Sequence, residues 1–179
     1  MNNHRDRITD ILDFWFGKPG DDDYLQSKSF WYGNAGDDLL VRNVLGIDYE
    51  RARADELDSW TDTAEGAIAL ILLLDQVPRN IFRDKPDAYA TDEKALKIAK
   101  KIIDEGWDKE QPPIIRRYIY SPFNHSENLD EQERSVELFT ELGDPEQLYW
   151  AKSFYNVIKC YGRFPHRDRI LGRNVPGPF

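Results

Sequence analysis

Residues 67–83 constrain the fold of this chain more than any other segment. They begin with an apolar run, residues 67–74, which has no polar face and is typical of a fully buried helix. Polar residues then follow, and among them Pro78 has no amide hydrogen and crowds the carbonyl of Leu74. Pro78 also disfavours helical geometry at Val77. The sequence therefore predicts a buried helix that breaks where it gains an acid, amides and two arginines.

The polar end of this predicted helix favours a functional site. Ionisable groups that lie in clefts often take part in binding or catalysis. We therefore expect Asp75, Arg79, Asn80 and Arg83 to bind a ligand. The alternative is that Asp75 and Arg79 neutralise each other and cap the broken helix.

Length and composition indicate a soluble globular protein. The chain has 179 residues, enough for one domain that buries roughly 70% of its unfolded surface. Its residues are 40% hydrophobic and 32% charged, which excludes a disordered chain. We expect a single all-helical domain over residues 1–179, with flexible ends at residues 1–6 and 174–179.

Charge and cysteine content restrict partners and location. The formal net charge of −9 argues against binding to nucleic acid or to an anionic membrane. The longest apolar run is far shorter than the ~20 residues of a membrane-spanning helix, and the first residues lack a signal-peptide core. Because Cys160 is the only cysteine, a reducing compartment is expected. Together these features predict a cytoplasmic protein.

Helical periodicity recurs along the chain, and no stretch alternates long enough to predict a strand. We predict an all-α fold of about seven to nine helices, in which short links make successive helices pack antiparallel. Predicted helices cover residues 8–16, 37–44, 49–57, 64–76, 86–105, 112–121, 128–142 and 145–161. Predicted core residues are Trp15, Leu70, Leu74, Ile98, Ile102, Phe139, Phe154 and Ile158.

A second candidate cluster lies in residues 118–127. Here His125 and Glu127 are expected in a loop that follows a helix broken by Pro122. Such a pair is suited to acid–base catalysis. The alternative is that Ser126 or Asn128 caps the next helix, with Glu127 favouring its positive end. That alternative explains Glu127 better than it explains His125.

A third cluster, residues 162–173, concentrates positive charge in an acidic protein. Guanidinium groups bind carboxylates and phosphates as rigid forks. We expect Arg163 and Arg167 to bind an anion, and His166 to be a catalytic candidate beside His125 and Glu127. The alternative is that these arginines pair with acidic residues of the protein body.

Motifs for cofactor or metal binding are missing from the sequence. There is no phosphate-binding glycine loop, His-Glu-x-x-His helix, Gly-x-Ser-x-Gly turn or cysteine pair. A metal would need His125, His166 and carboxylates such as Glu127 or Asp75 to converge, and their spacing does not require this. The sequence therefore predicts neither a metal nor a cofactor.

Residues 10–17, 74–83, 120–127 and 162–167 strongly resemble the bacterial family catalogued as domain of unknown function 924. The resemblance runs in order from about Ile8 to Arg173. It implies an all-α fold similar to tetratricopeptide-like helical superfamilies, and it implies no established activity. Two positions depart from the family's pattern: Val77 stands where Phe usually precedes the proline, and Asp168 stands where Asn is usual.

Two classes of function remain. A binding module would hold a small anionic molecule or a peptide carboxylate in a basic cleft. An enzyme, either a hydrolase or a lyase, would act on a small anionic metabolite through a His/Glu acid–base pair. Either function requires the three clusters to meet. We therefore expect one cleft to gather Asp75, Arg79, His125, Glu127, Arg163 and His166.

Overall fold

The computed structural model describes residues 3–174, with side chains from Arg5 onward. Within this range the chain is helical and has no β-strand. The α-helices are α1 (Asn3–Phe16), α2 (Ala35–Arg53), α3 (Ala64–Ile71), α4 (Val77–Ile81), α5 (Asp92–Asp104), α6 (Pro113–His125), α7 (Leu129–Leu142) and α8 (Pro145–Tyr161). The π-helix η3 (Leu72–Gln76) joins α3 to α4 without a break. The described residues therefore form seven separate helices, as the sequence predicted.

In the described part of the chain, four short 3₁₀ helices lie in the links between helices and a fifth follows α8. They are η1 (Ser29–Trp31), η2 (Asp58–Asp62), η4 (Pro86–Tyr89), η5 (Trp107–Glu110) and η6 (Pro165–Arg167). The sequence placed the residues of η4 in the following helix. The structure starts that helix, α5, only at Asp92.

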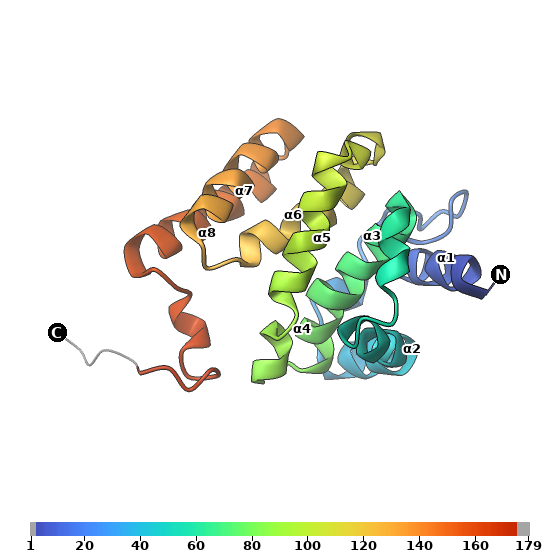
Figure 1. The fold of residues 1–179 in the computed structure, drawn as a ribbon, viewed down its shortest axis with the longest axis horizontal. Helices are drawn as coiled ribbons and strands as arrows, with labels where there is room; N and C mark the ends of the chain where they lie inside the picture. Colours follow the sequence, from blue (N-terminus) through green and yellow to red (C-terminus); the bar gives the residue numbers. More distant parts are fainter. Residues whose placement is uncertain (1–2, 175–179) are drawn as a thin grey trace.

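The N-terminal helices α1 to α4 lie at one end of the molecule, and α6, α7 and α8 lie at the other (Figure 1). Helix α5 stands between the two groups and packs against both α3 and α6. From α5 to α8, each helix packs against the next. This arrangement brings the C-terminal end of α6 close to the start of α5, where the candidate site is found.

At α7 and α8, polar N-caps begin the helices and a glycine ends α7, where the sequence predicted. Asn128 Oδ1 accepts the backbone N–H of Asp130 at 2.8 Å and begins α7, and Asp144 caps α8 in the same way. Gly143 ends α7 with a φ of 77°, a left-handed conformation that glycine adopts without steric cost. The predicted start and end of α7 are thus confirmed.

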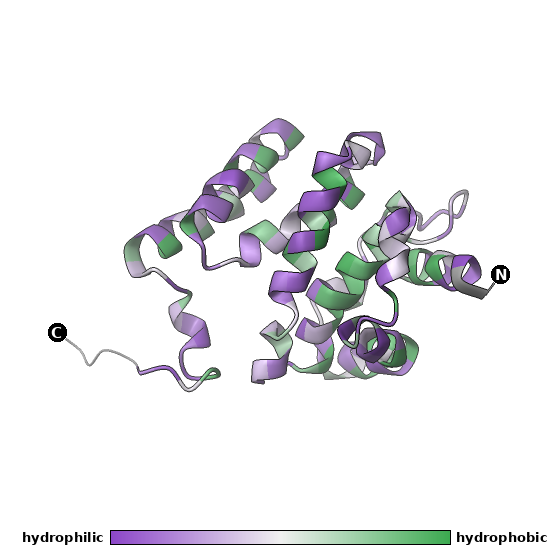
Figure 2. Ribbon diagram, viewed as in Figure 1, coloured by the Kyte–Doolittle hydropathy of each residue, from purple (hydrophilic) through white to green (hydrophobic). Residues whose placement is uncertain are grey.

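The core is built around α3, whose residues are buried and without charge from Gly66 to Ile71 (Figure 2). Seven of the eight predicted core residues are buried: Trp15, Leu70, Leu74, Ile98, Ile102, Phe139 and Ile158. The prediction for Phe154 is wrong, because its side chain is only half buried. Phe154 lines two surface hollows at the candidate site, described below.

The sequence predicted two short helices separated at Gly46, and this prediction is wrong. The structure has one continuous helix from Ala35 to Arg53. A glycine inside a helix costs only about 1 kcal/mol relative to alanine. The buried residues Val41, Leu45, Tyr49 and Ala52 keep helical spacing across Gly46, so packing outweighs this cost.

The sequence predicted that the buried helix would break before Pro78, but Pro78 only deforms it. The chain passes through a π-turn in which the N–H of Val77 donates to the carbonyl of Leu72. The carbonyl of Leu74, which Pro78 leaves without its helical donor, accepts the hydroxyl of Thr91 at 2.6 Å. The helix therefore continues to Ile81 and carries Asp75 and Arg79 into the centre of the molecule.

Helix α6 also runs through a proline. The sequence predicted that Pro122 would stop it, but α6 continues to His125. Phe123 and Asn124 are buried beyond the proline, and their packing offsets the lost hydrogen bond. His125 is therefore held in the last turn of a helix, and not in a loop.

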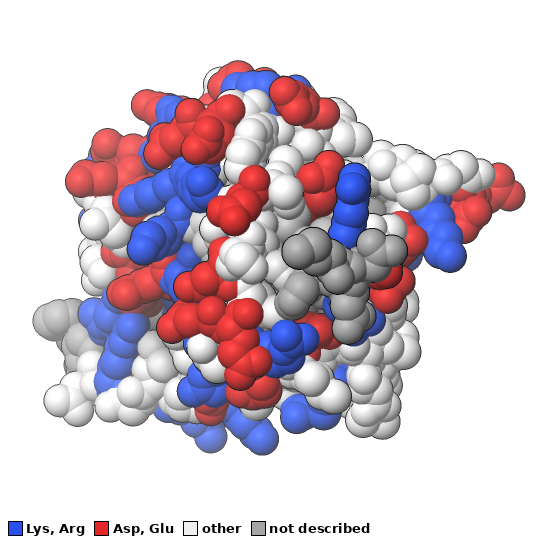
Figure 3. Space-filling view, turned by 45° about the vertical axis from the view of Figure 1, so that its right-hand side comes forward, with Lys and Arg blue, Asp and Glu red and all other residues white. Residues whose placement is uncertain are grey.

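The surface shown in Figure 3 carries acidic and basic side chains intermingled, without a continuous block of either sign. None of the helices in the described range is long and apolar enough to cross a membrane. The predicted flexible ends, residues 1–6 and 174–179, lie mainly outside the described residues. Within that range, Asn3 already begins α1.

Candidate functional site

Asp75 lies fully buried on the π-turn and accepts hydrogen bonds from three side chains. His125 Nδ1 is 2.7 Å from one carboxylate oxygen. The Ser121 hydroxyl and the Gln76 amide each donate to the other oxygen at 2.5 Å. Since a carboxylate only accepts, Nδ1 of His125 is assigned as the donor, which leaves Nε2 as an acceptor in the neutral ring.

The charge of Asp75 is stabilised although the residue is buried. Burial alone raises the pKa of a carboxyl group. Here the electrostatic interaction with His125, the charge of Arg79 and the hydrogen bonds from His125 and Ser121 outweigh burial, so the pKa of Asp75 lies below its ordinary value. Asp75 is therefore ionised at neutral pH.

This lowered pKa predicts a specific loss of stability in acid. The contribution of ionised Asp75 is fully present above about pH 3.9, the ordinary pKa, and is lost as the pH falls below it. We expect the free energy of unfolding to fall more steeply between about pH 5 and about pH 2 in the parent than in Asp75→Asn. Denaturant titrations at several pH values measure this, and parallel pH profiles would contradict it.

Arg79 joins Asp75 to the start of α5. Its Nη1 lies 3.3 Å from Asp75 Oδ1 and 2.9 Å from Asp92 Oδ1, while its Nη2 donates to Asp92 Oδ2 at 3.0 Å. Nη1 also donates to the backbone carbonyl of Asp75. Burial lowers the pKa of Arg79, but the two carboxylates outweigh it and the pKa is raised. Arg79 therefore remains charged although most of its side chain is covered.

Arg167, from η6, is the last member of this network, and its guanidinium lies against two aromatic rings. Its guanidinium is stacked between the rings of Tyr89 and Phe164, 4.4 and 4.6 Å from their centres. Nη2 donates to the carbonyl of His125 at 3.0 Å, and Nη1 is 3.5 Å from Asp92. Nε is buried and has no hydrogen-bond partner among the described residues. Burial and the nearby charge of Arg79 lower the pKa of Arg167.

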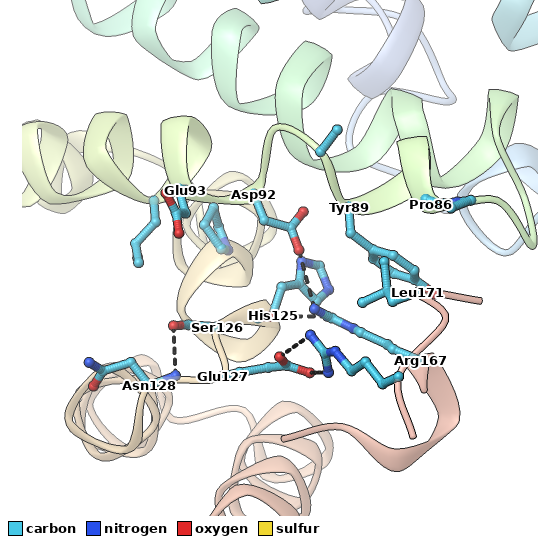
Figure 4. A pocket seen from close by; sticks show the side chains of 14 residues that line it. Pro86, Tyr89, Asp92, Glu93, His125, Ser126, Glu127, Asn128, Arg167 and Leu171 are labelled. Carbon is cyan, nitrogen blue, oxygen red and sulfur yellow. Dashed lines mark hydrogen bonds and ion pairs between the residues drawn. The ribbon is translucent and has the colours of Figure 1, made fainter. Parts of the chain in front are cut away.

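Three adjoining surface hollows meet at His125. The outer hollow, about 370 Å³, is lined by Asp92, Glu93, Glu127, Arg167 and Arg173 among others (Figure 4). The arginine hollow, about 290 Å³, is lined by Arg79, Arg83, Tyr89, Phe164, His166 and Arg167. The aromatic hollow, about 210 Å³, is lined by Trp31, Tyr32, Tyr118, Trp150 and Phe154. His125 lines all three.

The predicted acid–base pair required Glu127 to contact His125, but Glu127 has other partners. Its carboxylate binds Arg173 through two bonds of 2.9 and 2.6 Å and accepts the N–H of Phe164 at 2.9 Å. Burial opposes ionisation, but Arg173 and this N–H outweigh it and lower the pKa of Glu127. Glu127 therefore fastens the C-terminal segment to the end of α6 (Figure 4).

Arg163 forms an ion pair with an acidic residue of the protein, which was the alternative to anion binding for the third cluster. Its Nε lies 2.9 Å from both carboxylate oxygens of the buried Asp168. Arg163 is not among the residues that line the three hollows. The structure thus brings Asp75, Arg79 and His125 together, and it gives Arg163 to a neighbouring ion pair.

The remaining predicted residues divide between the hollow and the frame around it. His166 is exposed at the rim of the arginine hollow, and its pKa is lowered by partial desolvation of the ring and by the charge of Arg167. Arg83 also lines this hollow while it binds Asp38 at 2.7 and 2.8 Å. Asn80 is buried and donates to Phe30 and Asp38, both at 3.0 Å, so it fastens η1 and α2 to α4.

Sequence reasoning missed two members of the site. Asp92 holds both Arg79 and Arg167, but in the sequence it is only an acidic residue within the helix predicted over residues 86–105. Ser121 lies directly before Pro122 in the second cluster, and this position was the only feature of the sequence that pointed to it. In the described part of the chain, no three histidine, cysteine or acidic side chains are placed to share a metal ion.

Comparisons with known proteins show the family but no activity. A family model described as "Bacterial protein of unknown function (DUF924)" matches residues 11–176. The solved structure of a protein of unknown function, ATU0120 from Agrobacterium tumefaciens, is similar with a TM-score of 0.87 and 34% sequence identity. The match covers 98% of this chain and 95% of that one. No curated protein matches. The chain therefore belongs to the DUF924 family of bacterial proteins of unknown function.

Proposed function

We propose that the arginine hollow binds a small molecule that carries an anionic group, such as a phosphate or a carboxylate. The observation that carries this proposal is the buried guanidinium of Arg167, whose Nε has no partner among the described residues. An unpaired charged donor is costly to bury, and an anionic ligand would satisfy it. Among the described residues, Arg79, Arg83 and Arg167 line this hollow with the acidic residue Asp84. Arg79 and Arg83 also bind Asp92 and Asp38.

The binding proposal predicts a direct contact between an anion and Arg167. We expect inorganic phosphate to shift the Nε–H signal of Arg167 in a nitrogen–proton NMR spectrum of the parent protein. The variant Arg167→Gln should bind phosphate at least about tenfold more weakly, because a charge-assisted contact is lost. Arg169→Gln is the matched control, since Arg169 is exposed in the same segment.

Two outcomes would overturn the binding proposal. One is a saturating phosphate titration that leaves the Arg167 signal unmoved. The other is equal phosphate affinity in Arg167→Gln and the parent. Because Arg167 also bonds to His125 and Asp92, thermal melting must first show that the variant is folded. If it is not, the NMR titration of the parent decides the question.

A second candidate function is acid–base catalysis by His125 on the same ligand, as a hydrolase or lyase. The specific observation in its favour is the 2.7 Å contact between His125 Nδ1 and the buried carboxylate of Asp75. Such a carboxylate fixes the ring and its tautomer, and Nε2 is then the atom that accepts a proton. Asp75 takes the place that the sequence reasoning gave to Glu127.

The catalytic proposal predicts the tautomer of His125. We expect a long-range nitrogen–proton NMR spectrum of the neutral ring to show the proton on Nδ1. In Asp75→Asn the side-chain amide is able to donate to Nδ1, so the proton should move to Nε2 in a measurable fraction of molecules. A parent protein with its proton on Nε2 would remove the support for catalysis by this pair.

We also propose a tetratricopeptide-like relationship for the helical arrangement. In its favour, α5, α6, α7 and α8 follow one another in the chain and each packs against the next. Such scaffolds present one face to ligands, and a peptide carboxylate is an alternative occupant of the arginine hollow. The phosphate titration above, repeated with a short peptide, distinguishes the two ligands.

The proposed setting is the cytoplasm, with a small molecule and not a nucleic acid or membrane as the partner. The net charge of −9 supports this choice of partner. Cys160 is an exposed free thiol, which suits a reducing compartment.

A further inference from the structure

We propose that the aromatic hollow and the arginine hollow hold two parts of one ligand: a flat ring and an anionic group. The inference rests on the proposed anion site and specifies its ligand as an aromatic phosphate or carboxylate. The two hollows share three lining residues, Asn124, His125 and Phe154. They are therefore adjoining compartments, and a single small molecule would pass from one to the other beside His125.

The aromatic hollow is lined by rings from four elements or their ends. Its aromatic residues are Trp31, Tyr32, Tyr118, Phe139, Trp150 and Phe154. Two of them are conspicuously open to solvent, because Tyr32 is 68% exposed and Trp150 is 46% exposed. Large aromatic side chains gathered around a hollow are typical of a ligand-binding surface. A ring that stacked against them would cover this apolar surface.

The size of the aromatic hollow matches a single ring. Its volume is about 210 Å³, whereas an apolar cavity of about 150 Å³ is enough to bind benzene. A benzene-sized ring therefore fits, with room for a substituent that leads towards His125. Specific ligand sites commonly extend over about 300–1,000 Å³, so a ligand that also entered the arginine hollow would have a site of ordinary size.

Charge assigns the two ends of the ligand. The arginine hollow is lined by three arginines and one acid. Arg79 and Arg83 are held by acidic partners, so the group that favours an anion is Arg167, whose Nε has no hydrogen-bond partner among the described residues. The aromatic hollow is lined by Arg117 and Glu146, whose charges balance, and this favours an uncharged ring. The anion is therefore placed beside Arg167 and the ring beside Trp150, with His125 between them.

The test compares the affinities of four probes by calorimetry: phenyl phosphate, inorganic phosphate, phenol and tetramethylammonium. We expect phenyl phosphate to bind at least about tenfold more tightly than inorganic phosphate, because its ring stacks on aromatic side chains. It should also bind at least about tenfold more tightly than phenol, because its phosphate contacts Arg167. Phenyl phosphate should also change the tryptophan fluorescence, since Trp31 and Trp150 line the aromatic hollow. Inorganic phosphate should change the fluorescence much less.

Variants separate this inference from the proposed anion site. Trp150→Ala should remove the advantage of phenyl phosphate and leave the affinity for inorganic phosphate unchanged. Arg167→Gln should weaken both phosphates. The matched control is Tyr161→Ala, which removes a 60% exposed aromatic side chain from the same helix and should change neither affinity.

Each contrary outcome has a definite meaning. If inorganic phosphate binds but phenyl phosphate binds no better, the two-part ligand is wrong and the anion site stands. If phenol binds as tightly as phenyl phosphate, the aromatic hollow is a separate site and the inference is overturned. Preference for tetramethylammonium would assign the hollow to a cation, with the same consequence. If neither phosphate binds, the anion site and the inference both fail.

Discussion

Replacing Asp75 with alanine is expected to lower the free energy of unfolding by about 3–5 kcal/mol, because it leaves buried charged partners without their counter-charge. Asp75 is fully buried and accepts hydrogen bonds from His125, Ser121 and Gln76, while Arg79 lies beside it. Its removal leaves Arg79 with Asp92 as its acidic partner and takes the acceptor from three partly buried side chains. Chemical denaturation at neutral pH measures the effect.

The control for Asp75→Ala is Asp104→Ala at the exposed end of α5, which should change stability by less than about 0.5 kcal/mol. If Asp75→Ala costs no more than this control, the buried network contributes little to the fold. Asp75 would then be free of a structural role, and its burial beside His125 would have to be explained by function alone.

The second large effect is expected in a comparison of two phenylalanines that the sequence placed together in the core. Phe139 is fully buried and packs edge-to-face against Tyr120 at 5.8 Å. Phe139→Ala should therefore cost about 3–5 kcal/mol, as large-to-small changes in protein cores do. Phe154 is half buried and borders two hollows, so Phe154→Ala should cost about 1–2 kcal/mol.

Denaturation curves of the two variants show whether helical periodicity or the tertiary structure predicts the burial of these two residues correctly. That pattern gives Phe139 and Phe154 the same status, whereas the structure separates them. Equal losses of stability would mean that Phe154 is a core residue and does not stand at an open hollow. In Phe154→Ala, the binding free energy of phenyl phosphate should instead fall by more than the free energy of unfolding.

Much of the helical architecture was readable from the sequence, because helix ends are local features. Asn128, Gly143 and Asp144 act through hydrogen bonds and backbone angles of nearby residues, so their effect needs no tertiary contact. The same local reasoning failed at Gly46, Pro78 and Pro122. At these positions, packing of buried neighbours on the same helix outweighs the local preference, and that packing depends on the whole fold.

The candidate site was only partly readable for the same reason. The sequence identified Asp75, Arg79 and His125 because each lies in a cluster of polar residues beside a proline. It paired His125 with Glu127, its neighbour in sequence, although the structure pairs it with Asp75, fifty positions away. The contacts that Asp92 makes with Arg79 and Arg167 had no signal, since they join three separate segments.

The sequence by itself determined the helical class, most helix ends and the residues that form the buried centre, because periodicity and capping act over a few residues. Only the tertiary structure decided which charges meet. Arg163 and Arg167 are similar in sequence, yet one is held by Asp168 and the other lies between two rings beside His125. The physical reason is that an ion pair depends on distance in space, which helix packing sets and sequence spacing does not.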